Sequence, residues 1–149
     1  MRGPVVMSGY LDDPAATADA IDADGWLGSG DIARQDADGY LYIVDRRKDM
    51  INCAGFKVFP AEVERVIASH PAVAMVGVVG MPDPLKGEVP QAFVVLRHGT
   101  SLDPAALVAQ CRAELAAFKC PREITIVPDL PKTGSGKILR RELRRLYVG

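Results

Sequence analysis

The chain has 149 residues, of which 48% are hydrophobic and 25% charged, a composition ordinary for a globular protein that buries one core. Its formal net charge of −1 excludes bulk attraction to nucleic acid or to an anionic membrane, so a specific small ligand is favoured. Three cysteines without a C-x-x-C pair, and two histidines without metal-ligand spacing, argue against a disulfide framework or a metal site. No apolar run reaches transmembrane length, and we expect a cytoplasmic protein by default.

Residues 1–47 are interpreted as the end of an upstream unit. Asp13-Pro14 is typical of a helix cap and first helical residue, which predicts a short helix over residues 15–21. Residues 31–33 and 40–44 are joined through a turn that ends in Asp38-Gly39 and predict a hairpin. This segment cannot bury its apolar side chains by itself, so we expect it to be a remnant of a larger domain.

Residues 48–149 have the pattern of an α+β unit. Charged residues 45–49 bring the chain to the surface, and Gly55 supplies the unusual backbone angle of a short hairpin. Residues 81–84 are expected to end the strand that precedes them. The other elements we predict are a three-stranded sheet over residues 73–79, 91–96 and 124–127, with helices over residues 60–69, from residue 104, and over residues 138–147.

Lys137 is the strongest candidate for chemistry. It follows the flexible glycines of PKTGSGKIL, where a lysine can be presented to phosphate oxygens. A Walker A loop is excluded because Pro131 stands where glycine is required and Ile138 where serine or threonine is required. From composition alone, a solvated loop lysine is the more common outcome.

Three stretches in order, GWLGSGDIA, VDRRKDMINCAGFKVFPAEVE and LPKTGSGKILRREL, resemble the AMP-forming acyl-CoA synthetases of the adenylate-forming superfamily. The fatty-acyl-CoA ligases look most similar. The resemblance covers nearly the whole chain but only the C-terminal part of the family. It implies that residues 1–47 are the C-terminal remnant of the large AMP-binding domain and that residues 48–149 are the small C-terminal lid domain.

The resemblance also implies roles for five residues. Lys137 matches the catalytic lysine that contacts the substrate carboxylate and the α-phosphate while the acyl-adenylate forms. Asp31 and Arg46 match residues that hold the ribose of ATP or AMP, although Asp31 could equally be a turn residue. Lys48 matches the hinge of domain rotation, and Gly55 lies beside the tunnel for the pantetheine arm of coenzyme A.

The implied reaction has two steps: a fatty acid attacks ATP to give acyl-AMP and pyrophosphate, and CoA then displaces AMP to give a thioester. Mg²⁺, the phosphate-binding loop and the acyl pocket would belong to the large N-terminal domain, so we expect this chain to be inactive alone. Acyl-chain specificity and oligomeric state are not encoded in these residues.

Several alternatives stay open. The chain could be a free-standing lid that completes a separate adenylating domain in trans, or a fragment of an aryl-CoA ligase or of a peptide-synthetase adenylation domain. The basic residues of the terminal helix could form a solvated face or contact CoA phosphates; they are Arg140, Arg141, Arg144 and Arg145. Cys53 is interpreted as a small buried filler, since no histidine lies near it in sequence.

Overall fold

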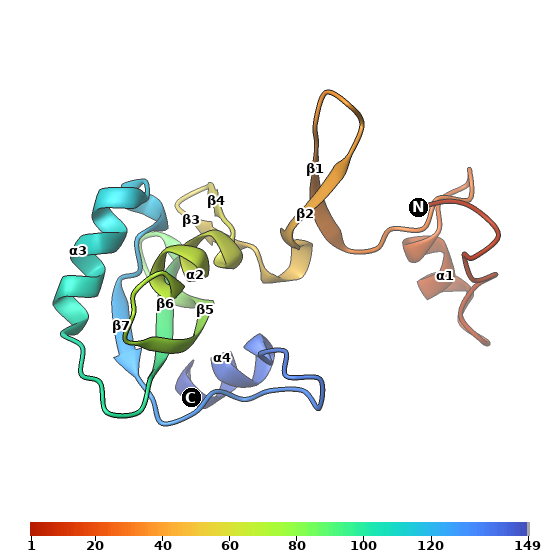
Figure 1. Cartoon of the computed structure of the whole chain (residues 1–149). Coiled ribbons are helices and arrows are strands. Elements are labelled where there is room, and N and C mark those ends of the chain that lie inside the picture. The colour runs from red at the N-terminus through yellow and green to blue at the C-terminus, as the bar shows by residue number, and fades with distance from the viewer. Residues whose placement is uncertain (149) are drawn as a thin grey trace. The chain divides into compact units, whose positions relative to one another are not determined.

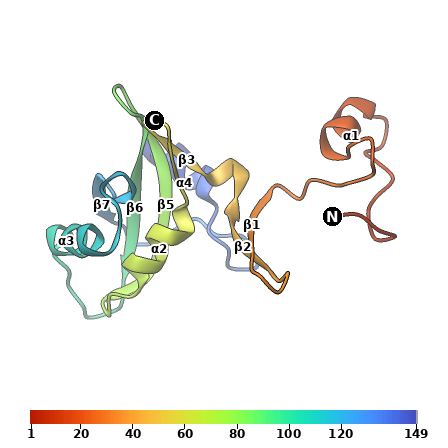
Figure 2. The same cartoon turned by 90° about the horizontal axis from the view of Figure 1, so that it is seen from above.

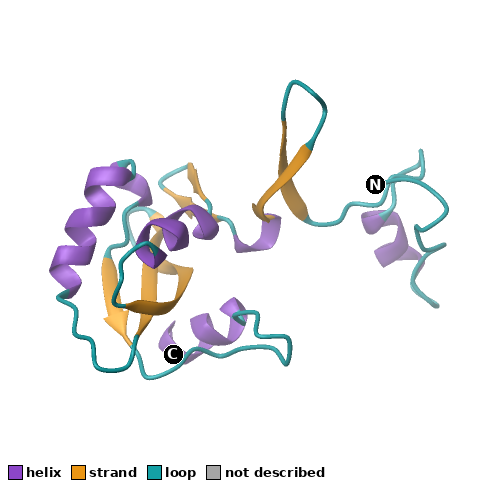
Figure 3. Ribbon diagram, viewed as in Figure 1, coloured by secondary structure: helices purple, strands orange, loops and turns teal. Residues whose placement is uncertain are grey.

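The computed structural model describes residues 1–148, and its elements group into two units, Met1–Arg47 and Lys48–Gly149 (Figure 1). We call them unit 1 and unit 2. Figure 3 marks their helices and strands. No helix among the described residues is long and apolar enough to cross a membrane.

Unit 1 contains one short helix and one hairpin. Helix α1 spans Pro14–Ala20, and the Asp13 side chain caps it by accepting a hydrogen bond of 2.8 Å from the Ala16 N–H. Strands β1 (Asp31–Gln35) and β2 (Leu41–Arg46) are antiparallel and confirm the predicted hairpin. Large apolar side chains on β2 stay exposed, as expected for a segment that cannot cover them itself.

Unit 2 is built on a five-stranded sheet. The strands are β3 (Ile51–Cys53), β4 (Phe56–Val58), β5 (Val73–Asp83), β6 (Gly87–Leu96) and β7 (Glu123–Ile126). Their order is β4-β3-β6-β5, and β7 pairs in parallel with β6. The three strands expected from the sequence are present, and the β3–β4 hairpin extends them by pairing Cys53 with Gly87.

Helices cover both faces of this sheet (Figure 2). They are α2 (Pro60–Ala68), α3 (Pro104–Glu114) and α4 (Arg140–Val148), with short 3₁₀ turns η1 (Arg47–Asp49) and η2 (Ala117–Lys119). The larger core cluster lies under α2 and α3, whereas Leu143 of α4 joins Val79 and Phe93 in a second cluster. Neighbouring residues of β6 alternate between the two clusters because successive side chains of a strand point to opposite faces. A side chain at Gly77 would begin 2.8 Å from Leu143 Cδ2, so glycine allows α4 to approach β5 closely.

Two element boundaries differ from the sequence-based expectation. Strand β5 continues through Pro82 to Asp83, and the chain turns only after that. Proline is tolerated there because β5 lies at an edge of the sheet, where a missing N–H removes no ladder bond. Helix α4 begins at Arg140 because Ile138 is still held in a bridge to Lys132.

The turn of the β3–β4 hairpin contains two residues with positive φ. Gly55 has φ +86°, as predicted, and Ala54 has φ 51°. Asparagine or glycine usually fills the first position of such a turn, so Ala54 carries backbone strain that the sequence analysis missed.

Candidate functional site

Asp31 and Arg46 are brought together at the open end of the β1–β2 hairpin. They are register partners, and Arg46 Nε lies 3.3 Å from Asp31 Oδ1. The Arg46 side chain is more than half exposed and that of Asp31 about a quarter exposed, with relative exposures of 56% and 26%. The Asp31 N–H donates to Ser29 Oγ at 3.2 Å, which fixes the start of the strand. A carboxylate and a guanidinium are therefore presented side by side with capacity left for a ligand.

A β-bulge sets this pairing. The register shifts between Ile32 and Ala33, so that Asp45 and Ile43 are their respective partners and Val44 has no partner on β1. Such an extra residue turns side chains of a strand toward new directions and is frequent beside binding sites. Without the shift, Asp31 and Arg46 would not face each other across the hairpin.

Lys48 is exposed in the 3₁₀ turn η1, at the point where unit 1 ends and unit 2 begins. Its neighbours on both sides are fixed within their own units. The Arg47 N–H donates to the Gly30 carbonyl at 2.8 Å, and Asp49 Oδ2 accepts from Arg140 Nη1 at 3.1 Å. Lys48 is thus a short exposed link between two anchored residues.

Gly55 lies at the tip of the β3–β4 hairpin. A Cβ added there would meet nothing within 4 Å, so any side chain would project outward. The base of the turn is fixed, because the Ala54 N–H donates to the Lys86 carbonyl at 2.8 Å. Next to the tip, the Phe56 ring stacks on Phe118 with centroids 4.6 Å apart.

Lys137 ends a tight, hydrogen-bonded loop ahead of α4. The Thr133 N–H donates to the Lys137 carbonyl at 2.8 Å, and the Lys137 N–H donates to Thr133 Oγ1 at 3.1 Å. Gly136 has φ +81°, which closes the turn, and the Leu139 N–H anchors the loop to the Pro131 carbonyl at 2.8 Å. The Lys137 side chain is exposed and forms no ion pair within residues 1–148. Its ammonium group therefore extends from an ordered backbone into solvent.

Ionic contacts between α4 and other elements of unit 2 were not predicted from the sequence. Arg140 donates from Nε and Nη2 to both oxygens of Glu64, at 3.2 and 2.8 Å, in addition to its contact with Asp49. Arg144 Nη2 donates to Glu88 Oε1 at 2.9 Å. The Arg140 side chain is 23% exposed, so the interpretation of a solvated basic face is wrong for it, whereas Arg144 pairs with Glu88 but stays 48% exposed. The four-residue spacing of Arg140 and Arg144 is apparent in the sequence. Their acidic partners lie more than 50 residues away in sequence, so the pairing could not be predicted from it.

Asp83 is a further buried charge in unit 2. Its Oδ1 accepts from the Leu85 and Lys86 N–H groups, both at 2.9 Å, and its Oδ2 pairs with Arg122. The Lys86 and Leu85 N–H groups, with a smaller contribution from Arg122, hold the pKa of Asp83 below its usual value. Asp83 therefore stabilises the turn between β5 and β6.

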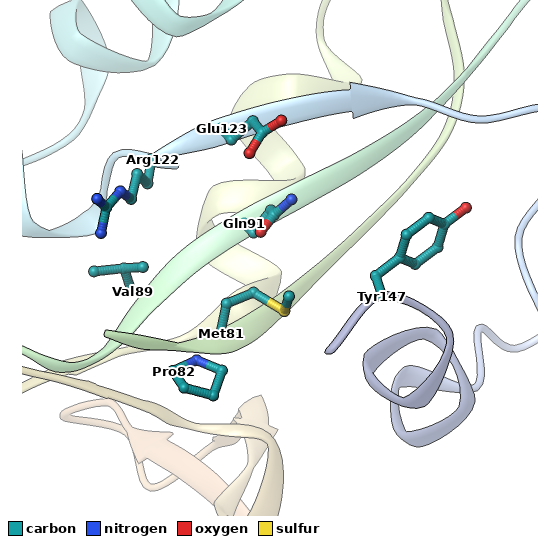
Figure 4. A pocket seen from close by; sticks show the side chains of 7 residues that line it. All are labelled: Met81, Pro82, Val89, Gln91, Arg122, Glu123 and Tyr147. Atoms are coloured by element: carbon teal, nitrogen blue, oxygen red, sulfur yellow. The ribbon is translucent and has the colours of Figure 1, made fainter. Parts of the chain in front are cut away.

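The pocket of Figure 4 is an open hollow of about 350 Å³. It is lined by Met81, Pro82, Val89, Gln91, Arg122, Glu123 and Tyr147. None of the five candidate residues lines it, so their chemistry does not depend on this pocket. Within the described residues, no three or more His, Cys, Asp or Glu side chains gather where they could hold a metal ion.

The cysteines are placed in or near the core. Cys53 is 2% exposed, in agreement with its interpretation as a filler. Burial raises the pKa of Cys111 to about 11, so its thiol stays protonated near neutral pH. These features do not favour nucleophilic chemistry at either residue.

The chain is similar to CoA ligases in sequence. A 3-[(3aS,4S,7aS)-7a-methyl-1,5-dioxo-octahydro-1H-inden-4-yl]propanoyl:CoA ligase of Mycobacterium tuberculosis is 54% identical over 146 residues, which are 98% of this chain and 29% of that protein. A long-chain-fatty-acid–CoA ligase of Yersinia pestis is 49% identical over 144 residues, 97% of this chain and 25% of that protein. The chain thus spans less than a third of the length of these relatives.

Solved structures of adenylate-forming enzymes match the fold. ATP-bound MatB from Rhodopseudomonas palustris superposes with a TM-score of 0.93 and 35% identity, over 98% of this chain and 29% of that one. The o-succinylbenzoate CoA synthetase MenE of Bacillus subtilis, in complex with an acyl-adenylate intermediate, gives 0.87 and 39%, over 96% and 29%. These matches confirm the small α+β fold expected from the sequence.

A family model identifies the part of the chain that carries this likeness. The model of the AMP-binding enzyme C-terminal domain matches residues 62–137, from α2 to the lysine of the glycine loop. That range covers strands β5, β6 and β7, helix α3 and the loop that presents Lys137. The chain therefore belongs to the family of AMP-binding enzyme C-terminal domains.

Proposed function

We propose that this chain acts as the C-terminal part of an ATP-dependent, AMP-forming acid–CoA ligase. The observation that carries the proposal is the ordered loop that projects the Lys137 ammonium group, unpaired within residues 1–148, at the end of the matched family domain. A compact cation on a fixed backbone suits the stabilisation of charge that develops during phosphoryl chemistry. Unit 1 would then be the remnant of the large AMP-binding domain and unit 2 the lid.

In the first step, a carboxylate oxygen of the acid attacks the α-phosphorus of ATP, and the bond to pyrophosphate breaks. Lys137 would contact the carboxylate and the α-phosphate and offset the negative charge that builds between them. Asp31 would accept hydrogen bonds from the ribose hydroxyls, and Arg46 would hold the same sugar beside it. The contact between Arg46 and Asp31 supports this assignment because it orients the carboxylate before ATP binds.

In the second step, the CoA sulfur attacks the acyl carbonyl carbon, AMP leaves, and the thiol proton passes to solvent. Rotation about Lys48 would withdraw Lys137 and bring the Gly55 hairpin to the site. The empty space beyond Gly55 supports a role next to the pantetheine arm, since any side chain there would reach outward. The exposed position of Lys48 between two anchored residues supports its role as the hinge.

The substrate of the complete enzyme would be a fatty acid, with ATP and CoA as the other reactants. The name of the Yersinia pestis relative, a long-chain-fatty-acid–CoA ligase, supports this class. The alternative is a ring-containing acid, which the bicyclic propanoate named for the Mycobacterium tuberculosis relative supports. Mg²⁺ would be bound by the large domain, and we assign no step of this chain to it. A cytoplasmic location stays a prediction from the sequence.

A chimeric enzyme tests the proposal. This chain replaces the matched 146-residue segment of the Mycobacterium tuberculosis ligase, and acyl-CoA formation is measured with the acid of that ligase. We expect activity in the chimera and none in this chain alone or in the truncated ligase. A chimera that folds, as judged by circular dichroism, but forms neither acyl-adenylate nor thioester would contradict the proposal.

The alternative of a lid acting in trans is tested with the same materials. Mixing this chain with the truncated ligase would restore activity if the two parts associate without a covalent link. If the mixture stays inactive while the chimera is active, the chain must be joined to its large domain.

A further inference from the structure

We propose that Arg140 and Arg144 are positioning residues that hold the Lys137 loop, the segment after the hinge and the Gly55 hairpin in one rigid body. The inference rests on the proposed function, because it concerns how the two parts of the lid serve the two reaction steps. The first observation is the composition of the face of α4 that packs against the sheet.

One face of α4 carries the buried Leu143, the partly exposed Tyr147 and two of the four arginines of the helix, Arg140 and Arg144. Arg140, Leu143, Arg144 and Tyr147 are spaced by three and four residues, which places them on one side of a helix. Leu143 is fully buried, and the Tyr147 ring stacks on Phe93 with centroids 4.3 Å apart. The core contacts therefore fix the rotation of the helix, and the two arginines are directed at the sheet and its neighbours.

Arg140 joins α4 to two other elements. Its guanidinium forms a two-pronged contact with Glu64 of α2 and a third hydrogen bond with Asp49 of η1. Glu64 is itself held in place, because its Oε1 also accepts from the Val78 N–H of β5 at 2.9 Å. All three charged side chains are between 16% and 23% exposed, so solvent weakens the contact less than at an open surface.

Arg144 makes the second connection, through Glu88 of β6. Glu88 Oε1 accepts from Arg144 at 2.9 Å, and its Oε2 accepts from the Asn52 N–H of β3 at 3.1 Å. One carboxylate thus links the helix to the strand that leads into the hairpin. The Asn52 N–H lies two residues before Ala54, at the base of the turn that presents Gly55.

Each connection ends beside a segment with a proposed role. Arg140 follows Lys137 by three residues, Asp49 follows Lys48 directly, and Asn52 precedes Gly55 by three residues. Figure 1 shows the β3–β4 hairpin and the loop ahead of α4 as separate projections of unit 2. A single rotation about Lys48 can replace the Lys137 loop by the Gly55 hairpin at the reaction site only if both segments keep a fixed position relative to Lys48. Arg140 and Arg144 would supply that relation.

Residual dipolar couplings of the 149-residue chain measure this relation directly. In the parent chain, amides of strands β5, β6 and β7, of the loop at residues 131–139 and of the hairpin at residues 51–58 should fit one alignment tensor. In the double variant Arg140→Met/Arg144→Met, we expect the amides of β5, β6 and β7 to keep a common tensor while the loop and the hairpin depart from it. The matched control is Arg141→Met/Arg145→Met, which removes the same charge from the same helix but only an i,i+3 pair with Glu142.

A second readout separates positioning from loss of folded protein. Active sites of the chimera are counted by titration with a non-hydrolysable acyl-adenylate analogue. Per active site, the kcat of both half-reactions should be at least tenfold lower in Arg140→Met/Arg144→Met than in the parent chimera. The KM for ATP should stay within twofold. Arg140→Lys/Arg144→Lys, which keeps charge but loses the forked contact, should be intermediate and serves if the methionine variant does not fold.

The proposal is overturned if the loop and the hairpin of the methionine variant, or of the lysine variant used in its place, keep the alignment tensor of strands β5, β6 and β7. It is also overturned if the control variant loses the common tensor to the same extent. An inactive parent chimera would instead count against the proposed function, and the dipolar couplings would still decide whether the arginines hold the three segments together.

Discussion

Asp31 and Arg46 face each other across a bulged hairpin, with Arg46 Nε 3.3 Å from Asp31 Oδ1, although 15 positions separate them in sequence. The pair opens toward the exposed end of the hairpin, where a carboxylate and a guanidinium together offer acceptors and donors to a sugar. The resemblance assigns both residues to the ribose, and that assignment stays a prediction.

Asp31→Asn in the chimera should weaken ATP binding. The substitution keeps the shape of the side chain but removes its charge, and hydrogen bonds to charged groups contribute about 1.5–3 kcal/mol, roughly a 10-fold to 100-fold change in affinity. Asp38→Asn on the same hairpin is the control, because Asp38 is exposed in the turn. Equilibrium binding of ATP measures both variants, and equal affinities would remove Asp31 from the ribose site.

Substitutions at Gly55 should slow thioester formation according to their size. Gly55→Ala and Gly55→Leu share the strain of a positive φ, about 1–2 kcal/mol, and a Cβ at this position has no described atom beyond its chain neighbours within 4 Å. The difference between them therefore reports the bulk that reaches the CoA arm. We expect Leu to lower the rate of thioester formation from supplied acyl-adenylate at least tenfold relative to Ala, with adenylation equal in both. If Leu and Ala behave alike in both steps, Gly55 does not line the path of the thiol.

Asp83 should make the chain sensitive to acid. Its pKa in the folded chain is lowered by the Lys86 and Leu85 N–H groups, so its contribution is complete above the ordinary pKa of an aspartate and is lost as pH falls through the lowered value. Urea unfolding between pH 7 and pH 2.5 should show Asp83→Asn to be destabilised at pH 7 and closer to the parent chain at the acid end. A stability difference that does not change with pH would contradict the assignment.

Local signals in the sequence predicted much of the fold. Asp13-Pro14 and Asp103-Pro104 each mark a helix start, and both aspartates do cap, with Asp103 accepting from the Ala105 N–H at 2.9 Å. The turn signal at Asp38-Gly39 marked the first hairpin, and the apolar runs marked the central strands. These features succeed because the interactions that decide them lie within a few residues.

Other features depend on partners that are distant in sequence. Pro82 remains in a strand because β5 is at the sheet edge, which is a property of the whole sheet. The pairing of Arg140 with Glu64 crosses 76 positions, and nothing near either residue indicates it. The bulge that aligns Asp31 with Arg46 likewise follows from strand register, which side-chain alternation does not specify.

We propose that Lys137 serves the first half-reaction and not the second. Lys137→Ala in the chimera should therefore lower ATP–pyrophosphate exchange by about 10²-fold to 10³-fold, the usual cost of removing one preorganised charge stabiliser. Lys132→Ala is the control, since this lysine lies in the same loop but pairs with Asp129 at 2.7 Å.

The most direct measurement compares the two half-reactions of Lys137→Ala in one enzyme preparation, pyrophosphate exchange for the first and thioester formation from supplied acyl-adenylate for the second. We expect pyrophosphate exchange to be lost while thioester formation stays within a few-fold of that of the parent chimera. Equal loss of both, or unchanged exchange, would contradict this proposal.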